Sequence, residues 1–192
     1  AEAVKRLYPE AKLAIGPSID TGFYYDFDTP SFDRAALDAL EAEMKKIIKE
    51  GAEITRFELP RAEAIKFMEA KGEPYKVELI NDLPEGETIT TYQQDSYIDL
   101  CRGPHVESTK EINGQAFKIA KVAGAYWRGD AERPMLTRVY AYCFAKPNDL
   151  KDYLTMLAEA EKRDHRKLGV EMDLFHLDPE DPGQVFWHAN GW

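Results

Sequence analysis

The sequence predicts an α+β fold in which helices pack against an antiparallel sheet and a long linker helix follows. Several short segments are rich in β-branched and aromatic residues and are bounded by glycine, proline or aspartate, as is typical of strands. Residues 33–51 repeat apolar side chains at helical spacing, and residues 148–168 do so more weakly. We expect the helices on one side of the sheet, and no doubly wound parallel sheet.

The elements follow in order along the chain. Residues 1–8 are typical of the end of a helix, because no capping residue precedes them. In residues 33–51, Gly51 suits a C-terminal cap. Pro60 begins a helix that reaches Ala70, since proline is tolerated in a first turn. The expected strands are residues 12–16, 22–28, 53–59, 87–92, 96–101, 116–124 and 135–144.

The C-terminal part differs in character from the rest. One helix is expected from Asn148 to Leu168, ended by Gly169. Its apolar stripe stops after Leu157, and a helix that is polar all round is often a spacer between domains. The aromatic, proline-rich segment that follows is too short to fold alone. We therefore expect one domain over residues 1–146, with its first helix truncated, a linker helix over 147–170, and a truncated start of another domain over 171–192.

Composition limits the possible functions. No run of 18 apolar residues exists, so we expect no membrane span, and without a visible signal segment we expect a cytoplasmic protein. The net charge of −10 is unlike that of a protein that coats nucleic acid. Residues 102–138 nevertheless hold seven basic and four acidic side chains. Such a basic segment could bind a phosphate backbone locally, although a solvated surface is the plainer interpretation.

The segment YIDLCRGPHV, residues 97–106, places Cys101 four residues before His105. A zinc site needs three or four ligands, and this segment offers two. A cysteine beside a histidine can also act as a nucleophile with its base, but this spacing is common by chance. The third interpretation is a small buried thiol beside a turn. The residues alone leave all three open.

Six segments in order along the chain carry a resemblance: LYPEAKLAIGPSIDTGFYYDFD, GEPYKVELI, YIDLCRGPHV, KVAGAYWRGD, EAEKRDHRKLG and VFWHANGW. Together they closely resemble the bacterial threonyl-tRNA synthetase family. The resemblance implies that residues 1–146 form the editing domain, of the type shared with alanyl-tRNA synthetases, which hydrolyses seryl-tRNA charged in error. It also implies that the class II catalytic domain starts within residues 171–192.

The resemblance assigns the site residues by their position in the motifs. Cys101 and His105 match an element that lines the editing pocket. Asp99 and Lys76 match an acidic and a basic residue of the same site, and Tyr92 matches a pocket wall. We expect a water nucleophile held by His105 and Asp99, oxyanion stabilisation by Lys76, and Cys101 as a small polar wall rather than a nucleophile. Arg102, Lys121, Tyr126 and Arg128 are candidates to bind the tRNA.

One position departs from the family pattern. Glu2 stands where many relatives carry the second histidine of a His-x-x-x-His helix, and the first would lie before Ala1. A glutamate can accept a proton from water, so we keep Glu2 among the catalytic candidates. The alternative is a non-catalytic module that binds the tRNA acceptor end after its editing activity has lapsed. Because the helix cannot supply two histidines, we expect no metal at this site.

The resemblance also implies cofactors and partners. The parent enzyme would ligate threonine to its tRNA using ATP and Mg²⁺, with a zinc ion in the catalytic domain, and would be a homodimer through that domain. None of these cofactors is expected in residues 1–192. The expected partners here are the CCA end of the threonine tRNA and its seryl ester.

Overall fold

The computed structural model describes residues 1–191, so Trp192, the last residue of the expected 171–192 segment, lies outside the described residues. The chain divides into two compact units, residues 1–147 and 148–192, which are described separately. Helices mix with antiparallel strand pairs throughout, which confirms the α+β class. No described helix has the length and apolar character needed to cross a membrane.

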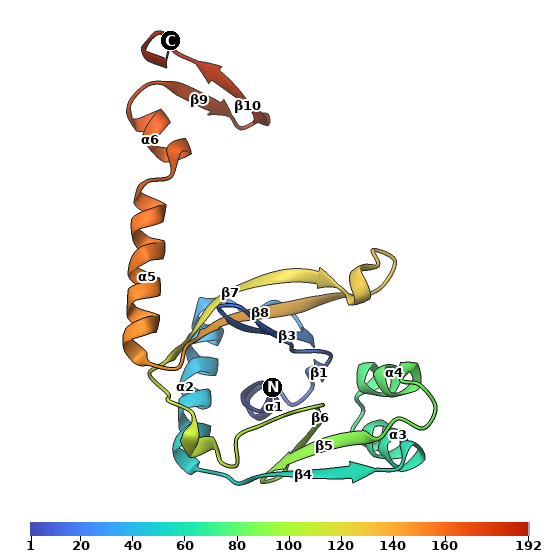
Figure 1. Ribbon diagram of the computed structural model, residues 1–192. Coiled ribbons are helices and arrows are strands. Elements are labelled where there is room, and N and C mark those ends of the chain that lie inside the picture. Colours follow the sequence, from blue (N-terminus) through green and yellow to red (C-terminus); the bar gives the residue numbers. More distant parts are fainter. Residues whose placement is uncertain (192) are drawn as a thin grey trace. The chain divides into compact units, whose positions relative to one another are not determined.

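The first sheet of unit 1 has the strand order β1-β3-β8-β7 (Figure 1). The short strand β2 also pairs with β3. All its pairs are antiparallel. Pairing continues past β1, because the Ala14 N–H donates to the Asp26 carbonyl and the Asp26 N–H donates to the Ile15 carbonyl. The strands are β1 (Lys12–Leu13), β2 (Ser18–Ile19), β3 (Gly22–Asp28), β7 (Phe117–Tyr126) and β8 (Met135–Cys143).

The second sheet of unit 1 has the order β4-β5-β6, so the strands form two sheets where one was expected. The reason is a separate core: Ile89 of β5 packs with Ala64, Met68 and Ile80 of two helices, away from the first sheet. The elements are β4 (Ile54–Leu59), β5 (Ile89–Gln94), β6 (Tyr97–Leu100), α3 (Arg61–Ala70) and α4 (Pro74–Asp82). Helix α4 was not anticipated from the sequence.

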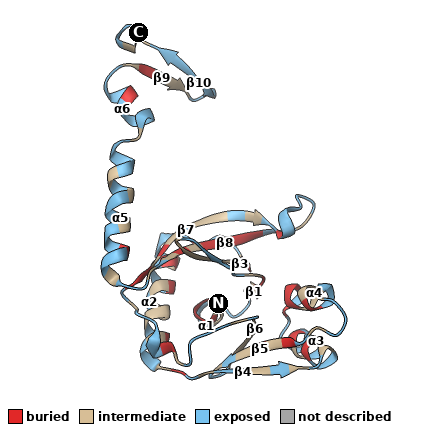
Figure 2. Ribbon diagram, in the orientation of Figure 1, coloured by how far each residue is buried: buried red, intermediate tan, exposed pale blue. Residues whose placement is uncertain are grey.

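Two helices complete the core of the first sheet. Helix α1 (Glu2–Leu7) lies between the two sheets in Figure 1, and its Ala3 and Val4 are buried. Helix α2 (Arg34–Glu50) buries Leu37, Leu40 and Ile47, and Figure 2 colours the buried residues of the chain red. Its start is capped by the Asp33 side chain, which accepts from the Ala36 N–H at 2.8 Å. Gly51 takes the left-handed conformation that ends the helix, as predicted.

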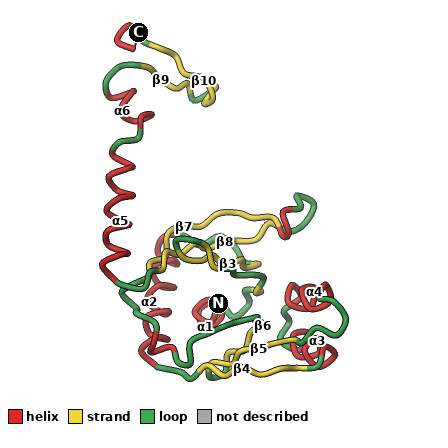
Figure 3. The backbone as a smooth tube through the Cα atoms, in the orientation of Figure 1, coloured by secondary structure: helices red, strands yellow, loops and turns green. Residues whose placement is uncertain are grey.

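The loops of unit 1 contain two short 3₁₀ helices (Figure 3). The segment that follows β6, with the Cys-x-x-x-His motif, has no regular structure until η1 (Thr109–Glu111). The second 3₁₀ helix, η2 (Trp127–Gly129), follows β7.

Unit 2 contains two helices where a single one was expected. Helix α5 (Pro147–Lys162) ends before Asp164, whose carboxylate accepts from the Arg166 N–H at 2.9 Å and caps α6 (His165–Glu171). Gly169 lies inside α6 instead of ending it. A Cβ there would come within 2.1 Å of the Phe175 ring, so glycine permits the close packing of β9. Strands β9 (Phe175–Asp178) and β10 (Asp181–Trp187) form an antiparallel hairpin, followed by η3 (Ala189–Gly191).

Candidate functional site: a cleft between the two sheets of unit 1

A cleft of about 830 Å³ lies in unit 1, and both sheets contribute to its walls. Tyr25 comes from β3 of the first sheet, and Tyr97 comes from β6 of the second. Helices α1, α2 and α4 close the remaining sides. All six pocket residues expected from the sequence line this cleft: Glu2, Lys76, Tyr92, Asp99, Cys101 and His105.

The β5–β6 hairpin sets one wall of the cleft. Tyr92 pairs with Asp99, and Gln94 pairs with Tyr97. Side chains alternate between the faces of a strand, so these four residues share one face. Cys101 continues the alternation beyond β6, because its N–H donates to the Thr90 carbonyl at 3.2 Å. The pattern Tyr97, Asp99, Cys101 in the sequence is therefore one polar edge of the cleft.

Asp99 is the most heavily bonded carboxylate of the cleft. Its Oδ1 lies 2.8 Å from the Lys76 Nζ and accepts the Leu100 N–H at 2.7 Å. Its Oδ2 accepts the hydroxyl protons of Tyr25 and Tyr97, at 2.8 and 2.9 Å. Burial disfavours the charged form of Asp99, but Lys76 and the two tyrosines outweigh it and hold the pKa of Asp99 below its ordinary value.

The four bonds to Asp99 change the role expected for it. A carboxylate offers about four acceptor positions, and here four donors fill them. The sequence predicted that Asp99 helps to hold the water nucleophile, but with four donors bound its carboxylate has no free acceptor position for that water. Asp99 contributes to the cleft instead by binding the Lys76 ammonium group at 2.8 Å.

Lys76 is 4% exposed, far less than the surface lysine that its sequence context would suggest. It lies in the first turn of α4, which begins at Pro74. Its Nζ donates to the Tyr25 hydroxyl oxygen at 3.0 Å in addition to its ion pair with Asp99. The ammonium group therefore lies at the cleft with a defined orientation.

The Cys-x-x-x-His loop brings Cys101 and His105 to the same cleft. The Gly103 N–H donates to Cys101 Sγ at 3.3 Å. The His105 ring packs on Tyr92 with its centroid 4.2 Å away. Partial burial lowers the pKa of His105 below its ordinary value, against the attraction of the Asp99 charge, so the imidazole is neutral near pH 7 and can accept a proton.

Glu2 is fixed at the edge of the cleft by two residues that the sequence analysis did not single out. Arg6 Nε donates to Glu2 Oε1 at 3.0 Å, and Gln94 donates to Glu2 Oε2. Burial raises the pKa of Glu2 despite the bond from Arg6. Arg6 also pairs with Glu43 and Glu50 of α2, so it ties α1 to that helix.

The four tRNA-binding candidates do not line the cleft. Arg102 is exposed and lies 3.5 Å from Glu87, and Tyr126 is exposed at the end of β7. Lys121 lies over the Tyr140 ring at 5.2 Å. Arg128 pairs with Glu78 at 3.0 Å and also with Asp82. The excess positive charge of residues 102–138 is thus largely neutralised by acidic side chains from elsewhere in unit 1, including those that pair with Lys118, Arg133 and Arg138.

The side chains of metal-ligating type that line the cleft are Glu2, Asp99, Cys101, His105 and Cys143. Within residues 1–191, no three His, Cys, Asp or Glu residues come together in a way that could hold a metal ion. The absence of zinc at this site stays a prediction.

Tyr25, Tyr97, Arg6 and Gln94 are the residues that sequence reasoning missed. Tyr97 and Gln94 carried a weak signal, because they share the strand alternation of Asp99 and Tyr92. Tyr25 carried none, because its partner Asp99 is 74 residues away in the chain.

Comparisons with known proteins show which families the chain is similar to. The family described as the threonyl and alanyl tRNA synthetase second additional domain matches residues 89–140, from β5 to β8. The matched range contains eight of the sequence-predicted cleft and tRNA-binding residues: Tyr92, Asp99, Cys101, Arg102, His105, Lys121, Tyr126 and Arg128.

Curated relatives extend the similarity beyond the second additional domain. The threonine–tRNA ligases of Acetivibrio thermocellus and Clostridium tetani are each 59% identical over all 192 residues, and that of Clostridium botulinum strain Kyoto is 58% identical. The chain spans about 30% of the length of these relatives. The resemblance to the threonyl-tRNA synthetase family is thereby confirmed.

Proposed function

We propose that the cleft hydrolyses the ester of serine wrongly attached to the threonine tRNA. The observation that supports this most directly is the convergence of an ammonium donor, a neutral imidazole and a thiol on one cleft within a second additional domain. Hydrolysis of an ester needs a donor for the developing oxyanion and a base for the water proton. Lys76 and His105 supply these two functions.

The reaction can be written with these groups. A water oxygen bonds to the ester carbonyl carbon, and the carbonyl π electrons move to the oxygen, which becomes an oxyanion. His105 takes the water proton, and Lys76 donates a hydrogen bond to the oxyanion. The bond to the ribose oxygen then breaks, and that oxygen takes the proton from His105. The products are serine and tRNA with a free terminal hydroxyl.

A separate hydrolytic site has a physical reason to exist. Serine lacks one methyl group of threonine, and a pocket shaped for threonine rejects the smaller side chain by only about 1–3 kcal/mol. A second cleft too narrow for the methyl group of threonine reverses the selection. Cys101 forms part of the wall in this proposal, and the nucleophile is water.

For the whole protein we propose threonine–tRNA ligase activity in the cytoplasm, with the threonine tRNA as partner. ATP with Mg²⁺ and a zinc ion would serve the ligase reaction outside the cleft, and the enzyme would be a homodimer. These proposals depend on the names of the relatives and on no contact in the described residues.

A deacylation assay tests the cleft directly. We expect this chain, and the full-length enzyme, to release serine from seryl-charged threonine tRNA faster than threonine from threonyl-charged tRNA. In the full-length enzyme, His105→Ala should lose most of the activity, while Cys101→Ser should keep measurable hydrolysis. A seryl thioester trapped on Cys101 would contradict the water mechanism. Binding of both charged tRNAs without any release would favour the non-catalytic module instead.

A further inference from the structure

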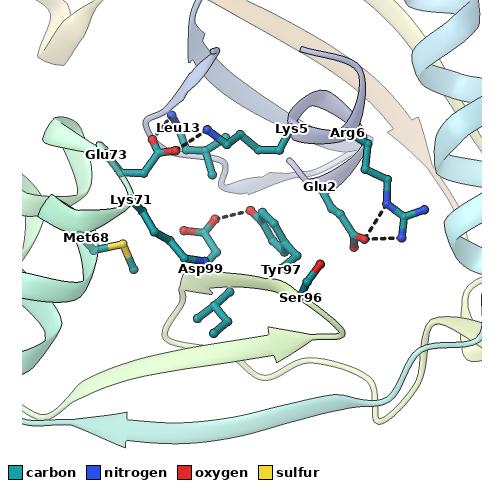
Figure 4. Close-up of a pocket in the computed structure, with 11 residues that line it drawn as sticks. Glu2, Lys5, Arg6, Leu13, Met68, Lys71, Glu73, Ser96, Tyr97 and Asp99 are labelled. Atoms are coloured by element: carbon teal, nitrogen blue, oxygen red, sulfur yellow. Dashed lines mark hydrogen bonds and ion pairs between the residues drawn. The ribbon is translucent and has the colours of Figure 1, made fainter. Parts of the chain in front are cut away.

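The hydroxyls of two half-buried tyrosines meet at the Asp99 carboxylate from different sheets. Tyr97 precedes Asp99 by two residues on β6, whereas Tyr25 lies on β3 of the first sheet. Both hydroxyl protons go to the same oxygen, Oδ2, at 2.9 and 2.8 Å. Nothing in the proposed reaction so far uses either tyrosine. Figure 4 shows the Tyr97 ring beside Asp99, with the dashed bond between them.

Counting donors and acceptors shows what the two hydroxyls do. Without them, Asp99 Oδ2 would have two empty acceptor positions in a buried environment, where an unpaired polar group is costly. Those positions would attract the Lys76 ammonium away from Oδ1, which it now contacts at 2.8 Å. With both tyrosines present, Asp99 offers Lys76 a single acceptor.

The same count applies to Lys76. An ammonium group has three N–H donors. One goes to Asp99 Oδ1 and one to the Tyr25 hydroxyl oxygen, at 2.8 and 3.0 Å. No third acceptor contacts this ammonium group within residues 1–191. One N–H therefore remains available to a ligand in the cleft that Lys76 lines.

We propose that Tyr25 and Tyr97 are positioning residues that fill Asp99 and hold the Lys76 ammonium so that its third N–H donates to the carbonyl oxygen of the ester. This inference rests on the proposed hydrolytic function and adds two residues to it. The two tyrosines differ in rank. Tyr25 is hydrogen-bonded to both Asp99 and Lys76, whereas Tyr97 is hydrogen-bonded to Asp99 and, within residues 1–191, makes no bond to Lys76.

A purely structural role is the competing explanation, because Tyr25 also links the two sheets through Asp99. The two explanations predict different effects when either tyrosine is replaced by phenylalanine. A structural link would affect stability and leave the kinetics of the folded fraction unchanged. A positioning residue affects the step in which charge develops, so kcat falls while KM changes little.

The kinetic test uses Tyr25→Phe and Tyr97→Phe, with Tyr24→Phe as the matched control. Tyr24 is the neighbour of Tyr25 on β3, and its ring packs on Tyr140 and Arg138 outside the cleft. Removing an oxyanion donor costs about 100- to 1,000-fold in kcat, so misplacing one should cost less. We expect kcat for seryl-tRNA to fall about 10- to 100-fold in Tyr25→Phe and about 3- to 10-fold in Tyr97→Phe. KM should stay within about twofold, and Tyr24→Phe should match the unchanged chain.

A second measurement reads the ammonium group without any turnover. Competitive acetylation with acetic anhydride, followed by mass spectrometry of the peptides, compares the reactivity of Lys76 with that of the exposed Lys110 in the same chain. Acylation needs an accessible amine, and Lys76 is 4% exposed with its Nζ bonded to Asp99 and to the Tyr25 hydroxyl. We expect Tyr25→Phe to raise the ratio of Lys76 to Lys110 acetylation at least about threefold at pH 8, and Tyr24→Phe to leave it unchanged.

The two measurements separate the inference from the proposed function. If Tyr25→Phe raises the ratio of Lys76 to Lys110 acetylation but the unchanged chain never releases serine, the positioning of Lys76 is supported and the hydrolytic function is overturned. A chain that releases serine with the same kcat in Tyr25→Phe and Tyr97→Phe would overturn the positioning role. An unchanged Lys76 ratio in both variants, with circular dichroism showing them folded, would overturn it too. If Tyr25→Phe does not fold, Tyr97→Phe provides both readouts.

Discussion

Replacing Gly103 by alanine should disturb His105 through Tyr92. Gly103 has φ of +78°, and a Cβ at this position would lie 1.9 Å from the Tyr92 hydroxyl oxygen and 2.8 Å from Cζ. Neither distance can be accommodated, so the Tyr92 ring must move. The ring packs on His105 at 4.2 Å, and its displacement would expose the imidazole. Because burial lowers the pKa of His105, the pKa should rise toward the ordinary value of about 6.5.

The cost in stability can be worked from the backbone alone. A non-glycine residue in the left-handed region costs roughly 1–2 kcal/mol, and alanine restricts the unfolded chain by about 0.4–1 kcal/mol in compensation. The net loss is about 1 kcal/mol, or a fall in Tm of about 2–4 °C for a chain of this size. Gly86 has φ of +84° and nothing within 4 Å of its Cβ position, so Gly86→Ala carries the backbone cost without the collision.

The two variants therefore separate the effect of backbone strain from the effect of displacing the Tyr92 ring. We expect a loss in Tm in both variants, measured by circular dichroism, and a larger loss in Gly103→Ala, because it adds the collision with Tyr92 to the backbone cost. Only Gly103→Ala should raise the His105 pKa, measured by NMR titration of the imidazole C2 proton and assigned with His105→Ala. An unchanged His105 titration in Gly103→Ala would refute the contact between Gly103, Tyr92 and His105.

Two further predictions concern the charges and ligands of the cleft. Lys76→Met should lower the free energy of unfolding, measured in urea at pH 7, by about 3–5 kcal/mol, because it leaves the Asp99 carboxylate without its counter-ion. Adding Asp99→Asn to this variant should recover more than half of the loss. If the double variant recovers nothing, the loss comes from packing and not from the unpaired charge. Since the pKa of Asp99 is lowered by folding, its contribution to stability is present above about pH 4 and is lost as the pH falls through the folded pKa, and that acid dependence should weaken in Lys76→Met. The purified chain should contain no stoichiometric zinc by elemental analysis, and one zinc per chain that is lost in Cys101→Ser would contradict the metal-free site.

The fold could be predicted where the signal is local. Asp33 and Gly51 mark the ends of α2, and apolar spacing between them gives its buried face. The break between α5 and α6 depends on one cap at Asp164, which apolar spacing does not register. The division into two sheets depends on which strands pair, and that is decided by contacts distant in the sequence, such as Ile89 with Met68.

The candidate site shows the same limit. Cys101, His105 and Asp99 lie within one short motif, so the resemblance could assign them together. The role of Asp99 could not be predicted, because the donors that fill it come from β3 and α4 as well as from its own strand. The count of basic residues in 102–138 could not show how many of them are ion-paired, since pairs such as Arg138 with Asp26 join residues 112 positions apart.

The bond between Tyr25 and Asp99 has a mechanical consequence. Within residues 1–191 no strand of the first sheet pairs with a strand of the second, so backbone bonds between strands do not set the distance between their facing walls. The bond of 2.8 Å from Tyr25 to Asp99 joins the two sheets, together with Lys76, which contacts both residues, and such bonds tolerate only a few tenths of an ångström of stretch. The width of the cleft between the two sheets is then nearly fixed. A methyl group is several times wider than this tolerance. A cleft of fixed width can therefore distinguish two substrates that differ by one methyl group, without any residue that binds either side chain.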